Sequence, residues 1–164
     1  MLGKSPKEAG PEEGYPLYLI TQKDIAMTKS RTVPDYWLLS LLPENGILIN
    51  PIDAKNFGIK YGDQVKVVSA TNKEGVWDLK NGTIKPMIGK AQVTETIMSG
   101  VVTFTLGFGH WASGAVVKGD PRRATGVHAN VVMWIDPYLK NTGMFGPVGG
   151  SASFYDTKVK LIKV

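Results

Sequence analysis

The glycine-rich segment GFGHWASGA, residues 107–115, carries the residue types best suited to chemistry. It holds His110, and the only other histidine in the 164-residue chain is His128. A histidine acts as a general base or a metal ligand when a nucleophile or further ligands stand beside it. The sequence has no Gly-x-Ser-x-Gly segment that would expose a nucleophilic serine, and its two histidines lack the short spacing of metal ligands. We therefore expect no catalytic residue and no metal ligand, and interpret the segment as a loop that holds a ligand.

Anion binding is the chemistry that two segments support best. Residues 107–115 and the segment TQKDIAMTKSRT, residues 21–32, both combine small residues and hydroxyls with free backbone N–H groups. Backbone amides in such turns bind anions, and Lys23 or Arg31 would neutralise the bound charge. No Walker loop or Gly-x-Gly-x-x-Gly fingerprint is present, and glycine-rich loops often serve only as turns.

The composition excludes several other kinds of site. With no cysteine, the chain cannot bind zinc or an iron–sulfur cluster through thiolates, or form a disulfide. The net charge of +5 comes from dispersed Lys and Arg residues without a basic helix or an aromatic RNA-binding strand, so we expect no nucleic-acid partner. No apolar run is long enough to span a bilayer, and the first 14 residues lack the apolar core of a signal peptide, so we expect no membrane insertion.

The elements that must position these loops are mostly strands. Residues 1–14 have the composition of a flexible tail, and 15–164 are predicted to form one domain. Two short helices are expected. One lies within 35–46, with Trp37, Leu38, Leu41 and Leu42 on one side and Pro43 to Gly46 ending it, and the other lies over 50–59, with Asn50 as cap and Pro51 in first position. Alternating or continuous apolar residues predict strands over 15–23, 46–51, 64–69, 89–97, 100–108, 127–135 and 156–164. Hairpin turns are expected within 71–90 and a long glycine-rich loop over 141–153. Because no βαβ rhythm is present, the pattern favours a closed β-barrel.

Four segments, taken in order, resemble the C-terminal domain of the DMSO reductase family of molybdenum and tungsten oxidoreductases. They are YPLYLITQK, INPIDAKNFGIKYGDQVKVVSA, GKAQVTETIMSGVVTFTLGFGHWASGA and GVHANVVMWIDP, and the resemblance runs from Tyr15 to Val164. The Gly-His-Trp sequence is most similar to the tetrathionate, polysulfide and arsenate reductase branch. The resemblance implies a mainly β fold, a six-stranded double-psi β-barrel of the kind seen in aspartate decarboxylase, with short helices.

The same resemblance implies that the domain binds molybdopterin guanine dinucleotide. In this family two such cofactors hold one molybdenum or tungsten ion, and this domain covers them. The cofactor-binding positions carried over are Thr21, Gln22, Lys23, Thr28, Ser30, Arg31, Gly109, His110, Trp111, Asn130, Asp156 and Thr157. Two departures affect the first loop: Gln22-Lys23 replaces a commoner Gly-Arg, and Met27 stands where a histidine is frequent.

The resemblance also implies that the chain is not a complete redox enzyme. In the family, the metal ligand and the iron–sulfur motif come from other domains. We therefore expect either a C-terminal domain that works with N-terminal catalytic domains and an iron–sulfur electron-transfer subunit, or a small separate subunit like that of formylmethanofuran dehydrogenase. Two other functions of this fold remain open: self-cleavage at Gly150-Ser151, as in aspartate decarboxylase, and peptide binding, as in the recognition domain of certain AAA ATPases. The substrate, the choice of metal, the compartment and the oligomeric state are open at this point.

Overall fold

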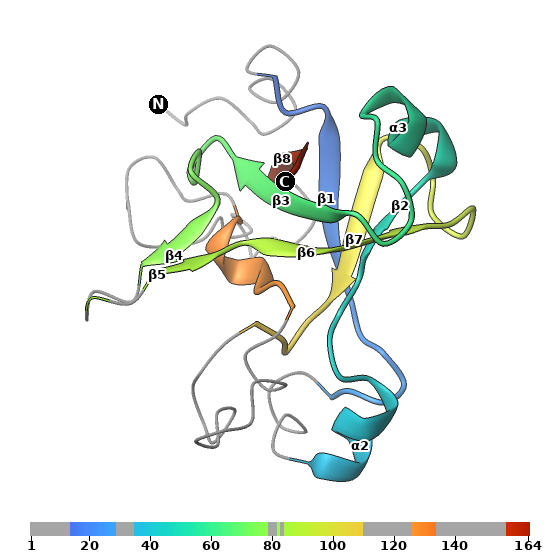
Figure 1. The fold of residues 1–164 in the computed structure, drawn as a ribbon, viewed down its shortest axis with the longest axis vertical. Coiled ribbons are helices and arrows are strands. Elements are labelled where there is room, and N and C mark those ends of the chain that lie inside the picture. The colour runs from blue at the N-terminus through green and yellow to red at the C-terminus, as the bar shows by residue number, and fades with distance from the viewer. Residues whose placement is uncertain (1–13, 29–34, 79–81, 83, 110–125, 134–156) are drawn as a thin grey trace, which may run out of the picture.

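The core of the molecule is a closed barrel of six strands. A computed structural model of the chain describes residues 14–28, 35–78, 82, 84–109, 126–133 and 157–164. The barrel strands are β1 (Leu17–Gln22), β2 (Ile47–Ile49), β3 (Gln64–Ser69), β6 (Ile88–Val93), β7 (Val101–Thr105) and β8 (Thr157–Lys163). They are hydrogen-bonded in the order β1-β7-β2-β6-β3-β8, and β8 returns to β1 to close the ring (Figure 1).

The strand order has an internal two-fold relation. Strand β1 runs parallel to β7 and β2 runs parallel to β6, whereas all other neighbours are antiparallel. Exchanging β1 with β6, β2 with β7 and β3 with β8 leaves both the order and these directions unchanged. Each parallel pair therefore joins the first half of the barrel to the second, which is the double-psi arrangement predicted from the resemblance.

Alternation along the strands fills the barrel with apolar side chains, as expected for a small barrel. Val65 and Val67 on β3 are fully buried, and Leu17 and Leu19 fill the corresponding positions on β1. The main cluster also includes Ile47, Ile49, Ala91, Val102, Phe104, Val159 and Leu161. The strands predicted from sequence alternation are thus confirmed for these six elements, although their ends differ by a few residues.

Two short helices and one hairpin complete the described elements. Helix α3 (Pro51–Asn56) is capped as predicted, because the Asn50 side chain accepts the N–H of Ile52 at 2.9 Å and proline occupies the first turn. Strands β4 (Val76–Asp78) and β5 (Ile84–Pro86) form a two-stranded hairpin inserted between β3 and β6. The hairpin expected within 71–90 is therefore confirmed.

Helix α2 (Tyr36–Leu41) forms where it was predicted, but its buried face differs from the prediction. Leu39 is the buried residue, whereas Trp37 and Leu41 are 86% and 75% exposed. The run WLLSLL is apolar at nearly every position, so periodicity could not select one face of so short a helix. The apolar side predicted for this helix, with Trp37, Leu38, Leu41 and Leu42, is therefore not the side that packs on the rest of the domain.

The strand predicted over 127–135 is also wrong within the described residues. Residues 126–133 instead form a crossing segment that includes a 3-10 helix, η3 (Ala129–Val131). Gly126 begins the segment with a positive φ of 82°, and the His128 side chain caps η3 by accepting the N–H of Asn130 at 3.3 Å. The apolar residues Val127, Ala129 and Val132 are buried because the segment lies over the end of the barrel rather than within its wall.

Candidate functional site

The predicted site residues gather at the barrel end where β1 and β7 finish. Because these two strands are parallel, their C-terminal residues emerge together, with Thr21 opposite Phe104 and Gln22 opposite Thr105. The pairing continues past β7, where the N–H of Leu106 donates to the carbonyl of Gln22 at 3.1 Å. In Figure 1 this is the end toward which the β7 arrow points, above α2. The loops after β1 and after β7 therefore leave the barrel side by side.

Gly109 brings the loop after β7 against the crossing segment. Its φ is +71°, in the left-handed region, and a Cβ built there would lie 2.7 Å from the backbone nitrogen of His128 and 2.8 Å from the carbonyl oxygen of Gly126. No larger residue fits this close approach of two backbones. Packing between the loop after β7 and the crossing segment therefore requires glycine at this position. From the sequence, Gly109 was predicted only as a cofactor-binding residue.

Asn45 fastens the crossing segment to the barrel and was missed by the sequence analysis. Its buried amide group donates to the carbonyl of Thr105 at 2.7 Å and to that of Val127 at 3.0 Å. Its Oδ1 accepts the N–H of Val127 at 2.8 Å. The only local pattern around it, Pro-Glu-Asn-Gly, is typical of a turn, and no sequence feature links it to residue 127.

Asn72 holds the other end of the crossing segment. Its amide nitrogen donates to Val131 at 2.9 Å and to Val76 at the start of β4 at 2.8 Å. The Thr71 hydroxyl donates to the carbonyl of Met133 at 3.1 Å. Asn72 therefore joins the crossing segment to the β4–β5 hairpin, and Figure 1 shows the two lying next to each other.

Trp77 and His128 form an aromatic contact between that hairpin and the crossing segment. Their ring centroids are 4.9 Å apart at an interplanar angle of 76°, an edge-to-face arrangement. Sequence reasoning gave His128 no special role. The structure shows that it supports Asn130 from one side, by accepting its N–H, and contacts Trp77 from the other.

A small second cluster supports the loop after β1. Met27 is 1% exposed and packs with Leu39 of α2 and Phe108 of the loop after β7, and Leu42 adjoins the cluster. A tight turn precedes Met27, in which the Asp24 carboxylate accepts the N–H of Ala26 at 2.9 Å. A buried apolar position explains why methionine is accommodated at the place where the family frequently has histidine. The loop after β1, which begins at Lys23, is thus anchored on α2 and on the loop after β7.

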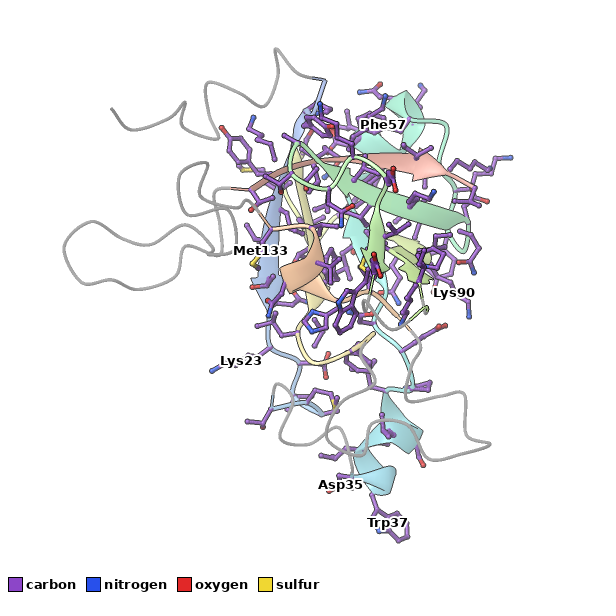
Figure 2. The ribbon with its side chains drawn as sticks, turned by 90° about the vertical axis from the view of Figure 1, so that its left-hand side faces the viewer. Lys23, Asp35, Trp37, Phe57, Lys90 and Met133 are labelled. Carbon is purple, nitrogen blue, oxygen red and sulfur yellow. The ribbon has the colours of Figure 1, made fainter. Side chains whose placement is uncertain are left out.

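Seven of the twelve predicted binding residues fall within the described part of the chain. Thr21 and Gln22 are half-buried at the end of β1, while Lys23, Thr28 and Asn130 are exposed and Gly109 is buried. Figure 2 shows Lys23 projecting outward between the barrel and α2. Thr157 opens β8 opposite Leu19 and is buried on the inward face of the barrel. The remaining five, Ser30, Arg31, His110, Trp111 and Asp156, lie outside the described residues, as do Gly150 and Ser151.

Lys23 is a described cation at this end and Asp24 lies next to it, whereas Lys85 stands on the β4–β5 hairpin. Lys23 is exposed, and Lys85 on β5 is half-buried, which lowers its pKa from 10.5 to about 8 because burial disfavours the charged form. Within the described ranges, no three His, Asp or Glu side chains gather as they would to hold a metal ion. Hydroxyl, amide, ammonium and backbone N–H groups at one end of a barrel suit recognition of a phosphorylated heterocycle better than hydrolytic chemistry.

Comparison with known proteins assigns the domain. The family model described as the Molydopterin dinucleotide binding domain matches residues 17–145. The chain belongs to this family of molybdopterin dinucleotide-binding domains. The matched range includes β1 through the crossing segment, and therefore every element of the barrel end except the start of β8. The resemblance to the DMSO reductase family is confirmed.

Curated relatives of the domain are much longer reductase polypeptides. A selenate reductase polypeptide from Mesobacillus selenatarsenatis is 40% identical over 156 residues, which cover 90% of this chain and 15% of that protein. A tetrathionate reductase polypeptide from Archaeoglobus fulgidus is 34% identical, covering 68% of this chain and 9% of that protein. The molybdopterin-containing polypeptide of arsenate respiratory reductase from Chrysiogenes arsenatis is 31% identical, covering 90% and 17%. The chain thus spans less than a fifth of the length of each of these relatives.

A solved structure supports the fold independently. Acetylene hydratase from Pelobacter acetylenicus superposes with a TM-score of 0.64 over 94% of this chain and 19% of that chain, at 16% identity. At this identity the similarity establishes the shared fold and nothing more. Among the described residues there is no helix long and apolar enough to cross a membrane.

Proposed function

We propose that this molybdopterin dinucleotide-binding domain binds the guanine form of the cofactor at the barrel end where β1 and β7 finish. The family match over residues 17–145 is the observation that carries the proposal, because it includes both loops that leave this end and the crossing segment. Sites in which a ligand lies against the loops at one end of a rigid barrel are common, since the strands fix the loop geometry. When bound, the cofactor supplies the dithiolene sulfurs that ligate a molybdenum or tungsten ion.

The side chains at this end fit such a cofactor chemically. Lys23 is exposed next to the end of β1 and would attract the diphosphate, while Thr21 and Gln22 add a hydroxyl and an amide. Asn130 would hydrogen-bond the pterin or guanine ring through its exposed side chain, with its backbone held by His128. The close approach at Gly109 holds the loop after β7 against the crossing segment that carries Asn130, so the backbone of this part of the site is positioned before the ligand binds.

We propose further that the domain is the C-terminal part of the large polypeptide of a molybdenum or tungsten oxidoreductase that reduces an inorganic oxyanion or sulfur compound. The names of the relatives support this reaction class, and their length supports the presence of other domains. Three large apolar side chains near the site, Ile25, Trp37 and Leu41, are more than 70% exposed, a pattern typical of surfaces covered in an assembly. Trp37 stands at the foot of the molecule in Figure 2. A separate iron–sulfur protein would deliver electrons to that holoenzyme.

Titration of the ¹⁵N-labelled chain with guanosine diphosphate, which carries the guanine and the diphosphate of the cofactor, tests the site. We expect amide shifts in residues 21–28, 105–109 and 126–130, and none around α3 at the opposite end of the barrel. Adenosine diphosphate is the matched control for recognition of the guanine ring. Shifts confined to α3 and the loop before β7, or an absence of shifts, would contradict the proposal.

A further inference from the structure

Helix α2 presents a large apolar side to solvent. Trp37 and Leu41 are four residues apart, so their side chains lie on the same side of the helix, and they are 86% and 75% exposed. Because each residue turns the helix by about 100°, Leu39 points the other way, where it is buried against Met27 and Phe108. Figure 2 shows Trp37 projecting from α2 away from the rest of the molecule. The helix therefore packs on its own domain by one side only.

The composition of α2 is that of a helix covered on every side. Residues 36–42, YWLLSLL, contain no charged side chain. A helix at a protein surface normally carries a polar side, whereas one that is apolar all round is normally buried within a larger protein. A helix of six residues is also too short to be stable without packing. Both features indicate that the side with Trp37 and Leu41 is covered in the assembled protein.

The same side suits neither a membrane nor a second copy of the chain. Helix α2 carries no Lys or Arg that would attract anionic lipid headgroups, as interfacial helices usually do. A stable interface between separate chains needs about 800 Å² from each partner. Trp37, Leu41 and Ile25, the large exposed side chains of α2 and the loop after β1, supply on the order of 500 Å² together. Self-association through this surface would therefore be weak.

Further domains of the same polypeptide can be held by a smaller area. A covalent link keeps two domains at a high effective concentration, so modest contacts are sufficient to hold them together. The chain spans less than a fifth of the length of the reductase polypeptides to which it is similar. Those relatives therefore contain a large amount of further polypeptide, which makes an intramolecular partner the occupant that fits this surface best.

We propose that the side of α2 formed by Trp37 and Leu41 is the surface on which the other domains of the same polypeptide dock. The assignment rests on the proposed function, which makes this domain part of a longer reductase polypeptide. The opposite side of α2 holds Met27 of the loop after β1 and Phe108 of the loop after β7. Docking therefore stabilises the two loops that leave the cofactor end of the barrel, and docking and cofactor binding strengthen each other.

Hydroxyl-radical footprinting with mass spectrometry, on this chain and on the longer polypeptide that contains it, tests the docking. Trp37 should be oxidised at least about 5-fold more slowly in the longer polypeptide, because the core of an interface excludes water. Met98, which is 70% exposed in the loop before β7, is the internal control and should be oxidised at similar rates in both. Equal oxidation of Trp37 in the two proteins, or protection of Met98 alone, would overturn the proposal. Protection of Trp37 in the isolated chain that increases with concentration would assign the surface to a second copy, and would overturn it as well.

Substitutions separate docking from folding and from the cofactor site. Trp37→Gln should leave the urea midpoint of the isolated chain unchanged, whereas Leu39→Gln should lower it, because only Leu39 is buried. In the longer polypeptide, Trp37→Gln should speed release of the bound cofactor at least about 5-fold, as measured by pterin fluorescence. Tyr61→Gln, at a side chain 74% exposed in the turn after α3, is the matched control. Equal release from the two variants would overturn the coupling. If guanosine diphosphate shifts no residue of the isolated chain, the cofactor site fails, and the protection of Trp37 still decides the docking.

Discussion

The side chain of Asn45 pairs with both backbone polar groups of Val127, 82 residues further along the chain. The amide thus imitates the edge of a neighbouring strand, and it satisfies an N–H and a carbonyl that are buried at the barrel end. A third hydrogen bond, to Thr105, connects the same side chain to the end of β7. One residue therefore sets the position of the crossing segment relative to the end of β7, at the barrel end where we place the cofactor.

Replacing Asn45 with alanine should destabilise the domain strongly. Three buried hydrogen bonds are lost, and their backbone partners are left buried without a hydrogen-bond partner. We therefore expect a decrease of about 3 kcal/mol in the free energy of unfolding. Urea denaturation monitored by circular dichroism measures it. Asn56→Ala, at the exposed end of α3, is the matched control and should change stability by less than about 0.5 kcal/mol. Equal effects of the two variants would show that the Asn45 contacts are not the anchor described here.

Gly109→Ala should disturb the site more than an equivalent change elsewhere. The new Cβ would collide with the backbone at His128, in addition to the strain of a φ near +71°. Gly58→Ala separates the two effects, because Gly58 has a φ of +65° but no atom within 4 Å of the built Cβ. We expect the control to lose about 1 kcal/mol of stability and Gly109→Ala to lose clearly more. Hydrogen exchange in residues 126–130 should accelerate only in Gly109→Ala.

Lys23→Met should reduce affinity for guanosine diphosphate and flatten its salt dependence. Lys23 is exposed, so its attraction for a diphosphate is screened by ions and should be worth a few-fold in affinity at low salt. Isothermal titration at two salt concentrations gives both quantities. Lys55→Met, on α3 at the other end of the barrel, carries the same change in charge and should leave binding unaltered. A loss of affinity that is the same for both variants would indicate a general charge effect and not a local contact.

Lys85 gives the domain a pH-dependent stability at alkaline pH. Between pH 8 and 10.5 the unfolded chain holds a proton on this lysine that the folded chain has released, so the free energy of unfolding rises with pH. Below pH 8 both states are protonated and the full cost of burial remains. Lys85→Met should therefore be more stable than the parent by about 2 kcal/mol at pH 7, after allowance for partial exposure, and should lack the rise. Denaturation at pH 7, 9 and 10 tests this, with Lys73→Met as the control that keeps the rise.

Local patterns in the sequence predicted the elements well. Asn50 and Pro51 mark the start of α3 by interactions that span only a few residues, and alternation over 64–69 marks β3. The strand order could not be predicted in this way, because no local pattern shows that Tyr18 pairs with Val101. Only the resemblance to a known family supplied that information. The strand predicted over 127–135 was wrong for a related reason. The burial of Val127 and Val132 depends on the barrel end beneath them, and periodicity alone cannot show that contact.

The site was predictable only in part. Thr21, Gln22, Lys23, Gly109 and Asn130 came from the family resemblance, and the structure brings them to one end of the barrel. Asn45 and Trp77 were missed because each contacts a partner that is distant in sequence.

The position of β8 between β1 and β3 has a consequence for how the domain is made. Residues 157–163 pair with the first barrel strand through Leu17–Leu19 and with β3 through Val65–Ser69. While the chain emerges from the ribosome, these two strands present unpaired edges until the final strand arrives, and such edges invite pairing with other chains. Closure of the ring therefore waits until residues 157–163 have been synthesised.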